Sequence, residues 1–208
     1  MIRFLLSQFS HVDIATETEV LVMYTMCVTE KTAEQQHTFE QTFLQMLLES
    51  DYDSITISDL CRRAGLSRKI FYRLYEKKAD ILYSLIDRTL MESDSYVPDP
   101  SVGPGEMHRF LAFWQYKKDL LDALLKHQSS SLLTDRAIRF AMRELGSPVR
   151  SFGAEEIRGS YESIVFYMSG MFSLLLVWHA QGFKQSIDEM SAVMMDLLTN
   201  PAFTEPPC

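Results

Sequence analysis

Apolar side chains recur every three or four residues along much of the chain, the spacing that places them on one face of an α-helix. The first such stretch covers residues 32–50, and its apolar positions are Phe39, Phe43, Met46 and Leu47. We expect an amphipathic helix here, ending at the turn-like residues 50–54. No stretch of useful length alternates apolar and polar positions as a half-buried strand would, and no internal repeat is present. The pattern therefore predicts an all-α protein.

A short, well-capped helix is predicted next. Thr56 precedes a one-sided apolar stripe, and Asp59, three residues later, completes a variant of the capping box. The stripe consists of Ile57, Leu60, Cys61 and Ala64. We expect the helix to end at Gly65, because a residue without a Cβ atom accepts the left-handed backbone of a sharp corner.

A third helix follows this corner directly. Leu66 is expected to reach the core, and Ser67 can cap a helix over residues 68–75. Phe71 and Tyr75 lie four residues apart, so they form its buried side. Two helices joined by a short turn that contains glycine make a helix-turn-helix unit.

The remaining pattern predicts longer helices. One extends from Lys78 to about residue 93, and the Pro- and Gly-rich segment 97–105 then forms the strongest break in the chain. Further helices are expected at Glu106–Lys126 (one helix or two), Leu132–Leu145, Glu155–Gln181 and Ile187–Leu198. Ser186 and Glu189 form a capping box for the last of them.

These breaks divide the chain into four segments. Residues 1–30 form an N-terminal extension without clear periodicity, which is disordered in one interpretation, and the functional chain begins at Met23 or Met26 in another. Residues 31–77 contain the helix-turn-helix, residues 78–96 are a connecting helix, and residues 97–208 are a larger helical domain.

One long stretch contains no charged side chain. Residues 163–183 include no Asp, Glu, Lys or Arg, a length that could span a membrane. Polar and small residues interrupt it, so a buried helix fits better. Several positions would let a second helix approach closely, as a dimer interface of two helices per subunit requires; they are Gly159, Ser163, Ser169, Gly170 and Ser173.

Charge is unevenly distributed along the 208 residues. The whole chain has a formal net charge of −8, which argues against general affinity for nucleic acids, because an acidic surface repels phosphate. Residues 56–90, however, hold eight cationic and four anionic side chains, a net charge of +4. A basic island in an acidic protein is typical of a local anion-binding surface.

The segment TISDLCRRAGLSRKIFYRLYEKKADIL, residues 56–82, closely resembles the signature of the TetR family of bacterial transcription regulators. The similarity covers roughly residues 32–90, about the N-terminal third. It lies in an ordered set of features: a capped helix, an Ala-Gly-hydrophobic-Ser turn, a helix that contains tyrosine, and then an aromatic residue and lysine opening the next helix.

Helical spacing and this resemblance together assign the expected DNA contacts. With Phe71 and Tyr75 inward, the opposite face of the third helix can enter a major groove, where Arg68 or Lys69 could reach guanine or phosphate. The resemblance places Tyr72 and Lys78 against the DNA backbone, and Ile70 either touches a thymine methyl or packs inside. The full expected set is Thr56, Ser67, Arg68, Lys69, Ile70, Tyr72, Arg73 and Lys78. We expect Lys78→Ala to weaken all duplexes alike and to leave the fold intact.

The resemblance also implies partners. It predicts a homodimer formed through the last two helices, which presents two reading heads to a pseudo-palindromic duplex. A small-molecule effector, of a class that the sequence does not name, would bind in the C-terminal domain; aromatic and sulfur side chains that could line its pocket are Trp114, Phe140, Tyr161, Tyr167 and Met171. The protein would then be a ligand-responsive regulator, and we expect it to act as a repressor. An alternative is a co-activator whose C-terminal domain binds a protein partner.

Other classes find no support in the sequence. HExxH, GxSxG, Walker and GxGxxG motifs are absent, so we expect no enzyme and no cofactor. The three cysteines and the histidines His108, His127 and His179 lack metal-ligand spacing. The cysteine pattern fits a reducing cytoplasm, and the opening residues are too interrupted for a signal peptide.

Overall fold

The computed structural model describes residues 29–97, 105–146 and 161–199, and within these ranges it contains nine α-helices and no β-strand. The expected all-α class is therefore confirmed for the described part of the chain. The N-terminal extension lies outside the described residues up to residue 28, as do most of the Pro- and Gly-rich break and the expected helical residues 155–160.

The first helices begin and end where local sequence signals place them. Helix α2 (Glu30–Glu49) starts at a capping box between Thr29 and Thr32, and the short 3-10 helix η1 (Tyr52–Ser54) follows it. The Thr56 hydroxyl accepts a hydrogen bond from the Asp59 N–H at 3.1 Å and thereby caps helix α3 (Ile57–Ala64). That hydroxyl also donates to the Asp59 carboxylate at 2.6 Å.

A left-handed glycine produces the corner between α3 and α4. Gly65 has a φ of +66°, a conformation that side chains with a Cβ rarely adopt. Helix α4 (Arg68–Leu74) then begins at Ser67, whose hydroxyl accepts from the Ile70 N–H at 3.3 Å. Helix α5 (Lys78–Ser95) follows after three residues, and the Asp80 carboxylate accepts from the N–H groups of Glu76 and Lys77.

Five helices make up the rest of the described chain. They are α6 (Glu106–Tyr116), α7 (Lys118–Lys126), α8 (Ser130–Gly146), α9 (Tyr161–Ala180) and α10 (Ile187–Thr199). The stretch 106–126 is thus two helices. Ser186 and Glu189 form the expected reciprocal cap of α10: the carboxylate accepts from the Ser186 N–H at 2.8 Å, and the Ser186 hydroxyl accepts from the Glu189 N–H at 3.2 Å.

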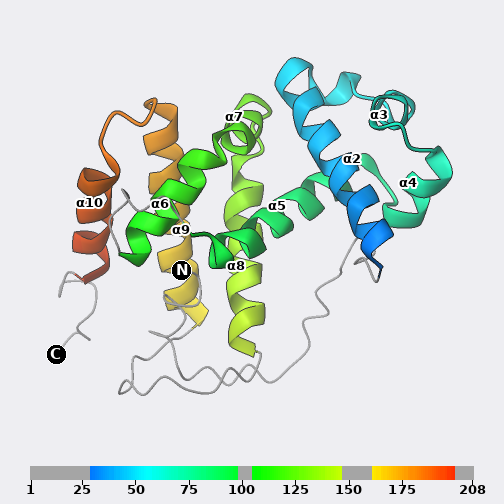
Figure 1. Ribbon diagram of the computed structural model, residues 1–208. Coiled ribbons are helices and arrows are strands. Elements are labelled where there is room, and N and C mark those ends of the chain that lie inside the picture. The colour runs from blue at the N-terminus through cyan, green and yellow to red at the C-terminus, as the bar shows by residue number, and fades with distance from the viewer. Residues whose placement is uncertain (1–28, 98–104, 147–160, 200–208) are drawn as a thin grey trace.

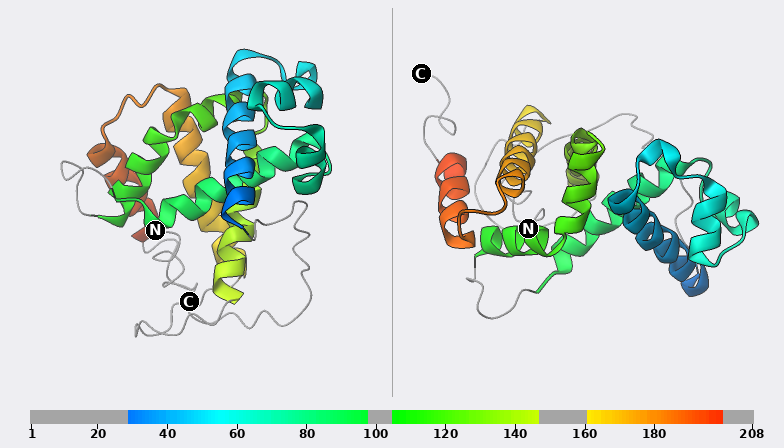
Figure 2. Two further views of the ribbon diagram at one scale, coloured as in Figure 1. Left: turned by 45° about the vertical axis from the view of Figure 1, so that its right-hand side comes forward. Right: turned by 90° about the horizontal axis from the view of Figure 1, so that it is seen from above.

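Helix α5 connects two groups of helices (Figure 1). Helices α2, α3 and α4 lie together at one end, and α6, α9 and α10 lie at the other. Along its length α5 contacts α2 and α8, while α8 packs beside α9 and α10 packs on α6. The view from above in Figure 2 shows the same order across the molecule. We call α2, α3 and α4 the head, and α6 to α10 the body.

Helix α9, which carries no Asp, Glu, Lys or Arg after Glu162, is buried along one side. Its inward residues are Ile164, Met168, Met171, Phe172, Leu175 and Trp178, all at most 2% exposed. No helix in the described part of the chain is long and apolar enough to cross a membrane.

Candidate nucleic-acid interface

The inner side of helix α4 packs against α2 within the head. Phe71 and Tyr75 are 0% and 2% exposed. The ring of Phe39 on α2 meets both edge-on, with ring centres 5.7 Å and 6.2 Å apart. The expected burial of Phe71 and Tyr75 is confirmed, and it fixes which side of α4 faces outward.

The outer side of α4 gathers cations around a tyrosine. Arg68, Lys69, Tyr72 and Arg73 are all exposed, and the Tyr72 side chain is 52% exposed. The Arg68 guanidinium lies 5.9 Å from the centre of the Tyr72 ring, one helical turn away. Arg73 donates to the Gln35 side-chain oxygen at 2.6 Å. The structure therefore brings these four side chains together on one accessible surface, which we call the α4 face.

Ion pairing separates the basic island into neutralised and unneutralised charges. The two arginines of α3 are paired, Arg62 with Asp59 and Arg63 with Glu49. Accordingly, hydrogen bonding to Thr56, with Arg62 adding to the effect, lowers the pKa of Asp59, and Arg63 lowers the pKa of Glu49.

Within the island, five cations form no ion pair with another described residue, and all lie on α4 or just after it. They are Arg68, Lys69, Arg73, Lys77 and Lys78, of which Lys78 is occupied by backbone carbonyl groups. An exposed cation without a carboxylate partner keeps its charge available for an anion such as phosphate. The positive charge of the island that no carboxylate neutralises is therefore exposed mainly on the α4 face.

Three further expected contact residues serve the fold. Thr56 and Ser67 are exposed, and each caps a helix through its hydroxyl. Ile70 is half-buried and packs against the core. Of the two interpretations of Ile70, the structure shows packing.

Lys78 is held by the η1 loop in this structure. Its ammonium donates to the carbonyl oxygens of Tyr52 and Ile55, at 2.5 Å and 2.9 Å, and lies 4.0 Å from the centre of the Tyr52 ring. Partial burial lowers the pKa of Lys78. Lys78 thus fastens the η1 loop to the start of α5, which conflicts with the expectation that its removal leaves the fold intact.

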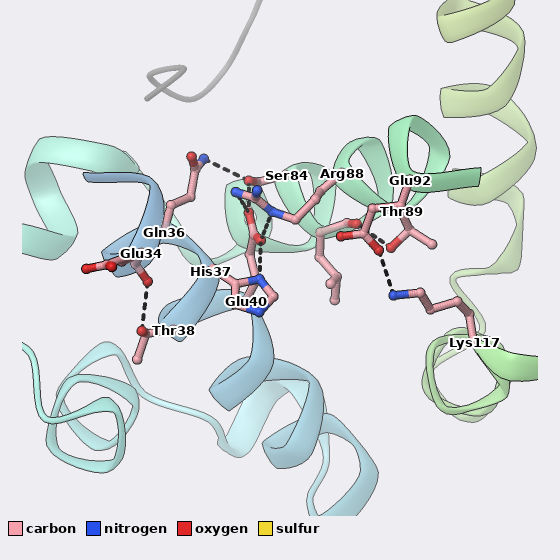
Figure 3. Close-up of polar contacts among 11 residues, drawn as sticks. Glu34, Gln36, His37, Thr38, Glu40, Ser84, Arg88, Thr89, Glu92 and Lys117 are labelled. Atoms are coloured by element: carbon pink, nitrogen blue, oxygen red, sulfur yellow. Dashed lines mark hydrogen bonds and ion pairs between the residues drawn. The ribbon is translucent and has the colours of Figure 1, made fainter. Parts of the chain in front are cut away.

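A buried polar cluster joins the head to α5 (Figure 3). The Glu40 side chain is 0% exposed and accepts from the Ser84 hydroxyl and from Arg88 Nε, the latter at 2.5 Å. Gln36 donates to the Ser84 oxygen at 2.9 Å. None of these four residues was predicted from the sequence as part of a site. The available signal was their spacing, because polar pairs four residues apart interrupt otherwise apolar helix faces.

The five expected effector residues do not surround the described cavity. Trp114, Phe140 and Met171 are core residues at most 5% exposed, and Tyr167 is half-buried. Trp114 packs edge-on against Phe172 with ring centres 5.5 Å apart. Tyr161 begins α9, but the surroundings of its side chain lie outside what the structure describes.

The described cavity lies at the junction of head and body. It has a volume of about 700 Å³ and is lined by Asp51, Tyr52, Asp53, Ser54, Ala79, Leu82, Tyr83, His127, Ser129 and Leu132. The lining comes from the η1 loop, α5 and the corner between α7 and α8. Of the residues singled out in the body, Trp114, Phe140 and Met171 pack as core in this structure.

Among the described residues, no group of three or more His, Cys, Asp or Glu side chains could hold a metal ion. Compared with known proteins, the chain matches no protein-family model and no curated protein sequence.

Proposed function

We propose that this protein is a homodimeric DNA-binding regulator of transcription that reads duplex DNA with α4. The observation that supports this function best is the α4 face, where unpaired cations surround an exposed tyrosine on a helix whose other side is anchored in the head. The resemblance of residues 56–82 to the TetR signature supports the same function independently of the geometry.

The dimensions of α4 suit the major groove of B-DNA, which admits an α-helix. Arg68 and Lys69 are in the first turn of α4 and would reach base edges or phosphates. Tyr72 and Arg73 are in the second turn and would contact the DNA backbone. The acidic remainder of the protein would disfavour binding in other orientations, because it repels phosphate.

Dimerisation is proposed to use α9 and α10. Among the α9 side chains that the structure describes, from residue 164 onward, the exposed ones form a single stripe without charge, at Phe166, Gly170, Ser173, Val177 and Ala180. A Cβ atom added at Gly170 would meet nothing within 4 Å, so this position leaves room for another helix. On α10, Val193, Met195 and Leu197 are 39–47% exposed. A second copy would cover this surface and form a four-helix interface.

Two α4 helices in one dimer would contact major grooves about 34–36 Å apart, one turn of DNA. An effector that binds more tightly to a different arrangement of the heads would lower the affinity for DNA. Bound DNA would lower the affinity for the effector by the same factor. The effector would be a small molecule, and regulation by repression is the mode we propose.

Selection from random duplex DNA tests this function. We expect a pseudo-palindromic sequence to be enriched, with affinity that falls by about 0.9 log units per log unit of salt for each phosphate neutralised. Enrichment of no duplex would overturn the proposal. A stable heterologous protein partner, together with no small-molecule effect on DNA affinity, would favour the co-activator alternative.

A further inference from the structure

At the contact between α2 and α5, each helix contributes two polar side chains that lie one turn apart, and the two pairs face each other. Gln36 and Glu40 are one turn apart on α2, and Ser84 and Arg88 are one turn apart on α5. The Ser84 hydroxyl accepts from Gln36 and donates to Glu40, and Arg88 donates to both Glu40 oxygens, at 2.5 Å and 3.4 Å. Figure 3 shows these side chains converging between the two helices.

These directional hydrogen bonds can all form in only one alignment of the two helices. Sliding α2 along α5 by one turn, about 5.4 Å, would leave the Glu40 carboxylate buried without its donors. Apolar side chains alone tolerate such shifts far better, because their contacts have no direction. Buried polar pairs are known to select a register in packed helices, at some cost in stability.

The same part of α5 is also fastened to the body. Asp87, next to Arg88 in the chain, binds Arg136 of α8 through both carboxylate oxygens. One turn further on, the Glu92 carboxylate accepts from Lys117 at 2.6 Å, between α6 and α7. Helix α5 is therefore paired with the head on one side and with the body on the other, within the segment from Ser84 to Glu92.

The cluster also lies close to the anchoring side of α4. Phe39, next to Glu40 in α2, packs against Phe71 and Tyr75. Tyr75 is buried, and its hydroxyl lies near Ser84 and Gln36. A change in the α2–α5 alignment would consequently move α4 relative to the body.

We propose that Glu40, Ser84 and Arg88 are positioning residues that set the angle of the head on α5, and with it the separation of the two α4 helices in the dimer. This inference rests on the proposed function. The three residues touch no DNA; they act by holding α4 at one place relative to α9 and α10, where the second copy binds.

The test compares half-site spacings. The duplex enriched from random DNA is remade with one or two base pairs added or removed between its half-sites, and a single half-site is measured alongside. We expect the wild-type protein to lose about tenfold or more in affinity when the spacing changes by two base pairs, because its heads are held at a fixed separation.

The main variant replaces both charged partners, Glu40→Met with Arg88→Met, which leaves no unpaired charge behind. We expect its spacing preference to fall below about threefold while its affinity for the single half-site stays within about twofold of wild type, because the reading face is untouched. The control is Asp135→Asn with Arg139→Gln, an exposed ion pair on α8, which should keep the wild-type preference.

The outcomes separate the two claims. An unchanged spacing preference in the folded double variant would overturn the positioning role and leave DNA binding standing. If the wild-type protein enriches no duplex, the proposed function itself fails. Should the double variant not fold, Ser84→Ala removes only the bridging hydroxyl and carries the same test, with a smaller expected loss of spacing preference.

Discussion

Arg68 and Tyr72 stack on the outer side of α4, with the guanidinium 5.9 Å from the ring centre. This contact is exposed and weak, about 0.5–1 kcal/mol, so it can orient the arginine without withholding it from DNA. We predict that Arg68→Ala changes the base preferred at one position of each half-site, with a loss of about 1–3 kcal/mol for the original sequence. Repeated selection with the variant measures this. A uniformly weaker variant with unchanged preference would instead assign Arg68 to phosphate; Arg139→Ala is the matched control.

Lys78 holds the η1 loop through two carbonyl oxygens. Hydrogen bonds from a charged donor contribute more than neutral ones, so we predict that Lys78→Ala lowers the free energy of unfolding by about 1–2 kcal/mol. Urea denaturation followed by circular dichroism measures the change. Lys69→Ala, on the exposed α4 face, should alter stability by less than about 0.5 kcal/mol. Equal stabilities of the two variants would show that the clamp contributes nothing.

Glu40 should make stability depend on pH in an unusual direction for a carboxylate. Burial raises the pKa of Glu40 above 4.5, although hydrogen bonds from Arg88 and Ser84 oppose the rise. The folded state therefore favours the protonated form: this stabilisation is fully present below 4.5, the value for an unfolded chain, and is lost as pH rises through the raised pKa.

Relative to Glu40→Gln, which cannot ionise, the wild-type protein should consequently lose stability as the pH rises from about 4 through the raised pKa of Glu40. Urea unfolding of both proteins at several pH values measures the difference. Carboxylates whose pKa is lowered, such as Glu49 and Asp59, are common to both proteins and cancel in the comparison. A difference that does not vary with pH, or one of opposite sign, would contradict the raised pKa.

At the scale of elements, the corner between α3 and α4 depends on Gly65. Its φ of +66° costs a residue with a Cβ about 1–2 kcal/mol, although an added Cβ would meet nothing within 4 Å. We predict that Gly65→Ala lowers the free energy of unfolding by about 1 kcal/mol through backbone strain alone. Chemical denaturation measures the loss. Gly170→Ala, which lies within α9 and has equal space, should not lower monomer stability.

Local signals account for most of the helix boundaries. The caps at Thr56, Ser67 and Ser186 and the glycine at position 65 act within four residues, so the sequence alone places them. The polar cluster between α2 and α5 could not be predicted in the same way, because its partners Glu40 and Ser84 are 44 positions apart in the chain. The four-residue spacing of Gln36 and Glu40 marks a polar position on an apolar helix face, but it does not reveal which distant side chain will meet it.

At the scale of the whole molecule, the uncharged stripe on α9 should determine the oligomeric state. Val177 is 52% exposed in the single chain and would be covered by the second copy. We predict that Val177→Glu converts the dimer to a monomer and weakens binding to the full duplex at least about tenfold, because a buried unpaired carboxylate is costly. Sedimentation and DNA titration measure both effects. Val97→Glu is the control, since Val97 is 85% exposed and belongs to neither α9 nor α10; dimerisation that survives Val177→Glu would place the interface elsewhere.

The expected effector residues illustrate the limit of reasoning from residue type. Trp114 and Met171 are large and apolar, so they fill either a pocket wall or a core equally well. Whether space remains beside them depends on how α6, α8 and α9 pack. The described cavity instead lies beside Tyr52 and Tyr83, at the junction of head and body.

The sequence by itself determined the all-α class, the caps and corner of α3 and α4, and which side of α4 carries Arg68 and Tyr72, because each follows from interactions within a few residues or from helical periodicity. Only the tertiary structure decided that Lys78 clamps a loop, that Glu40 is buried against Arg88, and that the α3 arginines are neutralised while those of α4 are not. These outcomes depend on which distant side chains come within about 4 Å, the range over which hydrogen bonds and ion pairs act.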